Sequence, residues 1–386
     1  MNSLNIKDKK YIANTYNRYP VNIVKGEGSS LFDEEGKEYI DLGSGIGVTA
    51  FGFNDEEYIL AVTEQLKKVQ HTSNLYYTAP QVKLAEMIAQ KTGLKKAFFS
   101  NSGAEANECA IKAARKWASE NKGEDYYKII TLKNSFHGRT ITTLSATGQD
   151  SFHKLFLPLT EGFLSVEAND ISAIKNACTK EKVAAVMVEL IQGEGGVLPL
   201  DKDYVKELYE FTKQNNILLI VDEVQTGNGR TGKLYCFEHF GIKPDIFTTA
   251  KGLGGGLPIG LTMLGEKVEN IFSFGDHGST FGGNPVAAAA AVNIISRIDE
   301  KLLNEVTLKS QYIFESLKDH KGVKDISGIG LMIGIETKKD AKEIVKNLIN
   351  KGVLVLTAKE KIRLLPALNI PFEQLKKAIE IIKTEL

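Results

Sequence analysis

The sequence predicts an α/β fold with two parts: a large domain whose mainly parallel sheet is flanked by helices, and a smaller α+β domain. Between about residues 80 and 265, apolar runs alternate with amphipathic helical stretches, as in sheets built from strand–helix–strand units. After about residue 285 the pattern changes to longer helical stretches around short strands. The length of 386 residues is enough for two or three domains with a sizeable core.

The first region is expected to supply the parallel sheet. The best-formed unit runs from 203 to 224, where Val205, Leu208 and Phe211 fall on one helical face and a near-continuous apolar strand follows. The expected elements, in order, are a strand at 96–100, a helix at 106–118, strands at 127–132 and 183–190, a helix at 203–216, and strands at 217–224, 245–250 and 259–265.

The second region is expected to start with one long helix and to continue with short strands and helices. The elements are a helix at 285–318, a strand at 331–336, a helix at 340–352, strands at 353–357 and 361–366, and a helix at 371–383. An early strand pair at 29–42, turning at Glu35-Gly36, is too small to stand alone and is placed with this region. The division is therefore 48–283 for the large domain and 1–47 with 284–386 for the small one, with the active site between them.

Composition favours a small molecule as the partner. The 48 basic and 48 acidic side chains cancel without a long block of one sign, which indicates neither nucleic acid nor an anionic membrane as partner. Apolar runs such as 286–292 are far shorter than the roughly 18 residues of a membrane span. The polar start without a signal-peptide pattern and three widely spaced cysteines (Cys109, Cys178, Cys236) predict a cytoplasmic protein with unpaired thiols.

Three segments place a reactive or ligand-binding residue at the end of an expected strand, where ligands collect in open α/β sheets. In the first segment, 98–107, a strand and a small polar turn lead into a helix start. The free N–H groups and positive dipole end there suit a phosphate, with the Ser102 hydroxyl as a further donor. The alternative is that Ser102 only caps the helix.

The second segment ends a buried strand with Asp222, which must face a positive partner because an unpaired buried carboxylate is costly. That partner is a metal ion, a Lys or Arg, or a protonated cofactor nitrogen. The six histidines are scattered without a pair at ligand spacing and there is no C-x-x-C, so no metal ligands are predicted.

In the third segment, Lys251 ends a strand and glycines follow at once. A partly desolvated lysine loses its proton more readily and becomes a nucleophile toward carbonyls, and the glycines let the backbone pass close to a bulky ligand. A solvated surface lysine is the alternative for this residue alone. Taken together, an imine-forming lysine, a carboxylate and a phosphate cradle are the three things that pyridoxal phosphate requires.

A competing interpretation comes from the stretch 227–234, GNGRTGKL, which matches a nucleotide P-loop except at its last position. Leu234 stands where a Ser or Thr must reach magnesium, and the following residues lack the helical period of a P-loop helix. A nucleotide-binding protein therefore stays open only as a distant alternative.

Motifs along nearly the whole chain resemble one family, the class III pyridoxal phosphate aminotransferases of fold type I, and within it the acetylornithine aminotransferases most. The resemblance implies a seven-stranded, mainly parallel sheet in the large domain. The motifs that carry it are NTYNRYPV, GEGSSLFDEEGKEYIDLGSGIGV, HTSNLYY, FSNSGAEANECAIKAARKW, SFHGRT, QGEGGV, DEVQTGNGRTGKLYCFEHFGIKPD, AKGLGGGLPIG, HGSTFGGNP and IRLLPAL.

The resemblance also implies roles for the residues that bind pyridoxal phosphate. Lys251 would bind the cofactor covalently and later move the proton, and Asp222 would hold the pyridinium N–H. Phe136 would stack on the ring, and Gln225 would lie near the ring hydroxyl. The phosphate cradle would consist of Ser102, Gly103 and Ala104. Thr280 would reach the phosphate from the partner subunit, which implies a homodimer with shared active sites.

For the substrates, the resemblance implies two arginines. Arg139 would bind an α-carboxylate, and Arg363 the far carboxylate of 2-oxoglutarate. Glu194 would pair with Arg363 when a substrate without that carboxylate is bound. Ser279 and Tyr16 are further expected substrate contacts.

The implied reaction transfers the δ-amino group of N2-acetyl-L-ornithine to 2-oxoglutarate, giving N-acetyl-L-glutamate 5-semialdehyde and L-glutamate, as in arginine biosynthesis. Ornithine, succinylornithine and 4-aminobutyrate are alternative donors, and a pyridoxal phosphate carrier without catalysis is an alternative of another class. Three departures from the family pattern, Phe53, Leu190 and Asn228, concern loop and pocket positions that set specificity.

Overall fold

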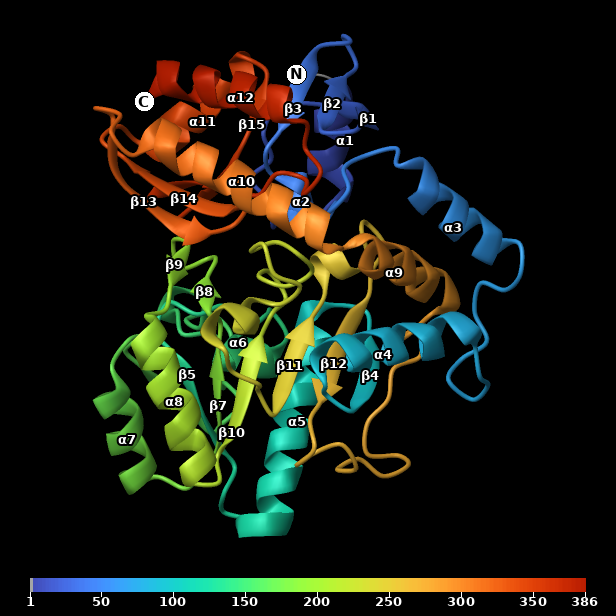
Figure 1. Ribbon diagram of the computed structural model, residues 1–386, viewed down its shortest axis with the longest axis vertical. Coiled ribbons are helices and arrows are strands. Elements are labelled where there is room, and N and C mark those ends of the chain that lie inside the picture. Colours follow the sequence, from blue (N-terminus) through green and yellow to red (C-terminus); the bar gives the residue numbers. More distant parts are fainter. Residues whose placement is uncertain (1–2) are drawn as a thin grey trace.

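The computed structural model describes residues 3–386, and its larger part is built around a seven-stranded sheet (Figure 1). Six strands are parallel to one another and β12 runs antiparallel to both of its neighbours, which confirms the predicted mainly parallel sheet. In spatial order the strands are β4 (Lys96–Ser100), β12 (Gly260–Leu264), β11 (Ile246–Thr249), β10 (Leu218–Asp222), β7 (Val183–Val188), β5 (Lys128–Leu132) and β6 (Phe163–Val166).

The length of each connection explains the direction of its strand. Parallel neighbours need a crossover of a dozen or more residues, usually a helix. Helices α5 (Gly103–Lys122), α7 (Ile171–Lys180) and α8 (Lys202–Gln214) serve this purpose. Between β11 and β12 there is only the short 3₁₀ turn η3 (Lys251–Leu253), so the chain turns back and β12 runs antiparallel.

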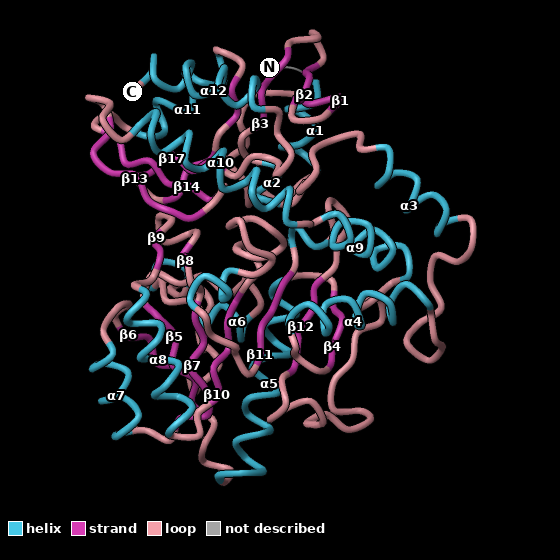
Figure 2. Tube along the Cα trace, viewed as in Figure 1, coloured by secondary structure: helices cyan, strands magenta, loops and turns pink. Residues whose placement is uncertain are grey.

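Both faces of the large sheet are buried, as the apolar strand of residues 217–224 predicts. On β10, Leu218 and Ile220 pack in the cluster that contains the α5 side chains, whereas Leu219 and Val221 pack in the cluster that contains those of α8. This alternation is the period-2 geometry of a strand between two helical layers. Figure 2 shows these helices on both sides of the strands.

The predicted long helix at 285–318 is wrong, because two helices occupy this stretch: α9 (Pro285–Arg297) and α10 (Glu300–Leu317). Asp299 between them is extended, and its side chain accepts the N–H of Leu302 at 2.8 Å. A carboxylate that satisfies the first free N–H groups starts a new helix at that point. α9 packs against α3 (Glu56–Leu66) and α4 (Ala79–Thr92).

The second part joins both ends of the chain. One of its four-stranded sheets holds β1 (Ile23–Glu27), β2 (Ser30–Asp33), β3 (Glu38–Asp41) and β15 (Val353–Leu354). The other holds β13 (Val323–Ile329), β14 (Met332–Thr337), β17 (Lys361–Leu364) and β16 (Leu356–Ala358), with α10, α11 (Ala341–Asn350) and α12 (Phe372–Glu385) as its helices.

The early strand pair does join the C-terminal region, as predicted, because β15 pairs in parallel with β3. Figure 1 accordingly shows blue and red segments together at one end of the molecule. The domain boundaries at residues 48 and 284 stay a prediction; α9, which the prediction assigns to the small domain, contacts helices of the large one.

Short elements complete the described chain. They are α1 (Ser3–Tyr11), α2 (Ser44–Gly47), α6 (Ile141–Ala146), η1 (Asp150–Phe152), η2 (Cys236–Phe240), β8 (Ile191–Gln192) and β9 (Leu198–Pro199). Across residues 3–386, none of the helices combines the length and apolar character required to cross a bilayer.

Candidate functional site

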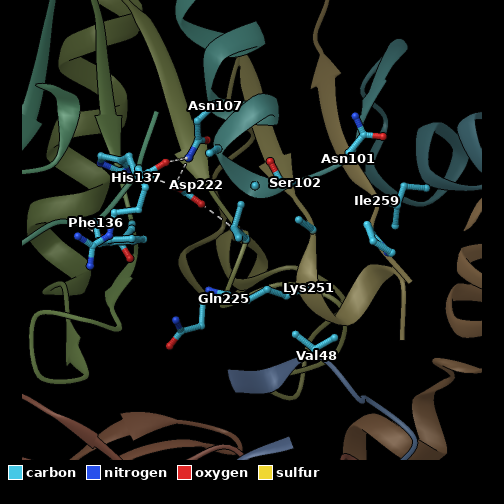
Figure 3. A pocket seen from close by; sticks show the side chains of 18 of the residues that line it. Val48, Asn101, Ser102, Asn107, Phe136, His137, Asp222, Gln225, Lys251 and Ile259 are labelled. Carbon is cyan, nitrogen blue, oxygen red and sulfur yellow. Dashed lines mark hydrogen bonds and ion pairs between the residues drawn. The ribbon is translucent and has the colours of Figure 1, made fainter. Parts of the chain in front are cut away.

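A cavity of about 580 Å³ lies where the parallel strands of the large sheet end (Figure 3). Its walls come from the segments that follow β4, β5, β7, β10 and β11, together with Tyr16 and Val48 from the N-terminal segment. Parallel strands that end at one edge bring residues distant in sequence to one place. The predicted site residues that line this cavity are Tyr16, Ser102, Gly103, Ala104, Phe136, Arg139, Asp222, Gln225 and Lys251.

Lys251 follows β11 directly and lines the cavity. Its φ of +44° lies in the left-handed region, a strained conformation for a residue with a side chain. Burial lowers the pKa of its amine, Glu194 raises it, and Arg363 lowers it again, so that the net shift is downward. A lysine in this state carries the neutral, nucleophilic amine more often than a surface lysine does.

Asp222 ends β10 and is held by three donors. Its Oδ2 accepts from Asn107 Nδ2 and from His137 Nδ1, both at 2.8 Å, and its Oδ1 accepts from the Val224 N–H at 3.0 Å. Thr248 in turn donates to Asn107 Oδ1 at 2.7 Å. Figure 3 shows Asn107 and His137 converging on the carboxylate. The network fixes the orientation of Asp222 at the cavity wall.

His137 and Asp222 form a buried pair. Burial lowers the pKa of the imidazole, but the hydrogen bond and the charge of Asp222 outweigh it, so the pKa is raised. The opposite ring nitrogen, Nε2, has no partner among the described residues. Glu189 lies close by, and burial raises its pKa to about 8 although the charge of His137 opposes the shift.

Asn107, His137 and Glu189 were not assigned a role from the sequence, although all three line the cavity. The first two lie inside motifs that were recognised, 98–107 and 135–140, and Glu189 directly follows β7. The position of Glu189, a polar residue directly after a buried strand, could have marked it as a candidate site residue.

The N-terminus of α5 faces the cavity. Ser102 is its N-cap, and the hydroxyl accepts the N–H of Glu105 at 3.2 Å, so the capping interpretation of Ser102 is confirmed. The preceding N–H groups of Gly103 and Ala104 have no acceptor within a helix. A Cβ on Gly103 would lie 2.6 Å from Val224 Cγ1, so only glycine lets the helix start pack this closely.

Glu194, Arg363 and Gln225 form a second polar cluster beside the cavity. Arg363 Nη1 donates to Glu194 Oε1 at 2.5 Å and to Gln225 Oε1 at 3.1 Å, and Gln225 Nε2 donates to Glu194 Oε1 at 3.4 Å. Burial raises the pKa of Glu194, but the charge and hydrogen bond of Arg363 outweigh it, so the pKa is lowered. The structure thus brings Glu194 and Arg363 together as the resemblance implies.

Arg139 lies at the exposed side of the cavity. Its guanidinium carbon is 4.1 Å from the ring centre of Phe152 and 5.5 Å from that of Phe136. The N–H of Phe136 is held by Glu189 Oε2 at 2.8 Å. Two aromatic rings therefore help to orient the guanidinium of a residue that lines the cavity.

Ser279 and Thr280 do not line this cavity. The Ser279 hydroxyl lies 3.1 Å from Asn101 Nδ2 and accepts the N–H of Gly282 at 3.0 Å, so it is used in holding its own loop. Thr280 is exposed. Within a single chain neither residue reaches the group of predicted site residues.

The P-loop alternative is wrong. Residues 227–232 are buried, and the chain continues into the 3₁₀ turn η2 rather than into an α-helix whose N-terminus could bind a phosphate. Gln225, two residues before this segment, lines the cavity, so the segment begins close to it.

Glu223, next to Asp222, gives the folded protein a pH-dependent stability. Burial raises its pKa to about 7 from the ordinary 4.5. The folded state therefore holds a proton that the unfolded state releases, and stability falls as pH rises from about 4.5 toward 7. Urea unfolding of Glu223→Gln across this range should show a slope smaller than that of wild type by up to about 1.4 kcal/mol per pH unit.

Gln is the suitable replacement because Glu223 accepts the N–H of Phe237 at 2.8 Å, a contact that the amide oxygen preserves. Glu266→Gln, at a surface ion pair with Lys95, is the matched control and should keep the wild-type slope. Equal slopes for wild type and Glu223→Gln would contradict the prediction.

The chain was compared with known protein families, curated proteins and solved structures. The family model described as Aminotransferase class-III matches residues 11–386. Among curated relatives, the acetylornithine aminotransferase of Haemophilus ducreyi is 47% identical, over 97% of this chain and 96% of its own length. The acetylornithine aminotransferase of Methanocaldococcus jannaschii is 45% identical, over 95% and 94%.

Solved structures show the same likeness at lower identity. An ornithine aminotransferase from Toxoplasma gondii superposes with a TM-score of 0.94 at 33% identity, covering 99% of this chain and 93% of that one; its description reports partial occupancy of PLP at the active site. The N-acetylornithine aminotransferase of Stenotrophomonas maltophilia gives a TM-score of 0.85 at 34% identity, with 98% of each chain covered.

Proposed function

This chain belongs to the class III aminotransferase family, and we propose that it transfers the δ-amino group of N2-acetyl-L-ornithine to 2-oxoglutarate. The products are N-acetyl-L-glutamate 5-semialdehyde and L-glutamate. Relatives named acetylornithine aminotransferase at 42–47% identity over nearly the full chain support the donor. The observation that carries the chemistry is Lys251, a partly buried amine with a lowered pKa in the same cavity as the fixed carboxylate of Asp222.

The residues of the cavity fit pyridoxal phosphate. Lys251 offers the amine that would hold its aldehyde carbon, Asp222 a carboxylate for its ring nitrogen, and the start of α5 free N–H groups for its phosphate. Gly103, which admits no Cβ, brings that helix start close to the cavity wall. Phe136 lines the same cavity, and we assign it to the ring face.

Bound pyridoxal phosphate supplies an aldehyde that condenses with amines and an electron-poor ring that takes up the electron pair left behind when a proton departs. The chain supplies the proton handling and the charge. Lys251 Nζ, freed when the substrate amine takes its place, is the general base for the proton on the δ carbon. His137 orients Asp222, because its Nδ1 and the Asp222 Oδ2 share a hydrogen bond in a buried site.

Substrate ends are assigned to the two arginines. Arg139 is proposed to bind the α-carboxylate, since its guanidinium lies over the Phe152 ring and the residue lines the cavity. Arg363 is proposed to bind the far carboxylate of 2-oxoglutarate. When the neutral acetylamino end of the donor is present instead, the contact between Arg363 and Glu194 keeps the buried guanidinium paired.

We further propose a homodimer in which Thr280 of each chain completes the phosphate site of the other. Support comes from its exposure and from its position outside the cavity of its own chain. Ser279 is proposed as a substrate contact of the same shared kind. A cytoplasmic location stays a prediction from the sequence.

The test is a visible absorption experiment on the purified protein with its cofactor. N-acetylornithine, ornithine, succinylornithine and 4-aminobutyrate are added in separate cuvettes. We expect acetylornithine to bleach the band at the lowest concentration and 2-oxoglutarate to restore it. If another donor bleaches the band at a lower concentration than acetylornithine does, that compound takes its place as the proposed donor. A band that no donor changes would contradict the aminotransferase activity itself.

The paired arrangement of Glu194 and Arg363 makes a separate prediction. Glu194→Ala should lower kcat/KM for acetylornithine by about 10- to 100-fold, because the buried Arg363 then has no counter-charge whenever a neutral substrate end is bound. The kcat/KM for 2-oxoglutarate should fall less, since its far carboxylate takes the place of the Glu194 carboxylate beside Arg363. Steady-state kinetics with both substrates measure the difference, with Glu266→Ala as the surface control. Equal losses for the two substrates would refute the assignment.

A further inference from the structure

The segment 225–230 has no part in the proposed chemistry beyond Gln225, yet it is buried and rich in polar groups. It includes the start of the stretch that resembles a P-loop in sequence. It leaves the end of β10 just after Asp222 and runs between the large sheet and the sheet that carries Arg363. The contacts of Asn228 and Arg230 show what this segment does.

Asn228 holds the backbone that leads into Lys251. Its Nδ2 donates to Thr249 Oγ1 at 2.8 Å and to the carbonyl oxygen of Ala250 at 3.2 Å. Ala250 directly precedes Lys251, whose φ of +44° needs support from its surroundings. Asn228 itself has φ of +58°, a conformation that Asn adopts more easily than most residues.

Arg230 holds the backbone at the end of the strand pair that carries Arg363. Its Nη1 donates to the carbonyl oxygen of Pro366 at 2.5 Å and to that of Leu331 at 3.1 Å. Pro366 follows β17, the strand of Arg363, and Leu331 precedes β14, which pairs with β17. Burial lowers the pKa of Arg230 to about 10, which leaves it charged at neutral pH, and among the described residues it has no ion pair with a carboxylate.

The backbone around Arg230 is in close contact with the same two places. The carbonyl oxygen of Arg230 accepts the N–H of Leu331 at 2.9 Å. A Cβ on Gly330 would lie 2.4 Å from the backbone of Thr231, and one on Gly229 would lie 3.0 Å from Leu368. A buried guanidinium that is bound only to carbonyl oxygens is a costly choice for stability alone. This cost in stability indicates that Arg230 is needed to fix the position of the backbone that it binds.

We propose that Arg230 is a positioning residue for Arg363, and that through Arg363 it sets the affinity for the dicarboxylate 2-oxoglutarate. This inference rests on the proposed function, since that function assigns Arg363 to the far carboxylate. Asn228, from the same segment, positions Lys251 instead. The two residues therefore act on different steps: Arg230 on one substrate, and Asn228 on the proton transfer common to both substrates.

The two half-reactions separate these effects, because the cofactor's visible band reports each one in a single turnover. For Arg230→Met we expect the apparent Kd of 2-oxoglutarate to rise about tenfold or more, since small misplacements of a binding group are costly. The apparent Kd and the limiting rate for acetylornithine should change by less than about twofold. Arg230→Lys, which keeps a charge and donors for both carbonyl groups, should recover part of the affinity.

Asn228→Gly supplies the contrast, because glycine accepts φ of +58° and removes only the two side-chain hydrogen bonds. Here the limiting rates of both half-reactions should fall by the same factor. Arg297→Met, which removes a partly buried arginine that is bound to Asp55 and does not line the cavity, controls for general destabilisation. Melting temperatures of all variants accompany the kinetics.

The inference is overturned if Arg230→Met weakens the binding of both substrates by the same factor, or of neither. It is also overturned if Asn228→Gly changes only the half-reaction with 2-oxoglutarate. Should Arg230→Met fail to fold, Arg230→Lys must itself show the selective loss. Failure of the proposed function looks different: the wild-type protein then does not react with acetylornithine, and the variants are compared with whichever donor reacts.

Discussion

Replacing Lys251 by Ala is expected to lower the rate of transamination by about 10³-fold or more, because the nucleophile and the general base are one group. The amine lines the cavity, and burial there lowers its pKa. The measurement is the rate at which acetylornithine bleaches the cofactor's band in a single turnover.

Two additions make this result specific to the amine. Lys243→Ala removes an exposed lysine that precedes the same strand and should keep full activity. A small primary amine in the buffer should return part of the lost rate to Lys251→Ala, because a free amine can enter the space left by the side chain and accept the proton. Normal turnover by the variant without added amine would contradict the mechanism.

Replacing Asp222 by Asn is expected to lower turnover by about 10²-fold or more, because a fixed charge in a water-excluded site acts where charge develops. The amide has the same shape but no charge, and its NH₂ group then faces either the Val224 N–H or the donors of His137 and Asn107. The pKa of His137 should fall below its ordinary value, since burial, the largest influence on it, is then opposed only by the weaker effect of Glu189.

Steady-state kinetics and an NMR titration of His137 measure the two effects of Asp222→Asn together. Asp245 offers the matched control: it lies at the other end of β11, accepts the N–H of Leu219 at 2.9 Å and pairs with Lys267. Asp245→Asn should change stability without changing the His137 titration. A His137 pKa that stays raised in Asp222→Asn would show that another group supports the imidazolium.

That Asp222 and Lys251 share one cavity could be predicted from the sequence because local signals coincide there, and their roles stay a prediction. Asp222 and Lys251 each end a strongly apolar strand, and the strand ends of a parallel sheet share one edge. The network around Asp222 was not predictable in this way. Asn107 and His137 meet the carboxylate from two other segments, and which loops meet depends on the strand order, which neighbouring residues do not encode.

The fold shows the same division between local and non-local information. Apolar periodicity located β4, β5, β7, β10, β11 and β12 but missed the short strand β6 at the edge of the sheet. The helix boundary at Asp299 depended on one side chain that caps α10 in competition with a continued helix. Thr280 marks a further limit, because its proposed partner is in a second chain and a single sequence carries no geometry for that contact.

The pairing of β3 with β15 has a consequence for how the protein is made. The contact of Lys37 with the carbonyl oxygen of Ile349 joins residues 312 positions apart. During synthesis, β3 therefore leaves the ribosome long before its partner strand exists, and the edge that β15 later covers stays open to other chains. The large sheet can assemble in the meantime, since its strands lie between residues 96 and 264. Completion of the β1–β2–β3–β15 sheet is thus a late, non-local event, and chaperones that shield strand edges should engage this chain from its N-terminal end.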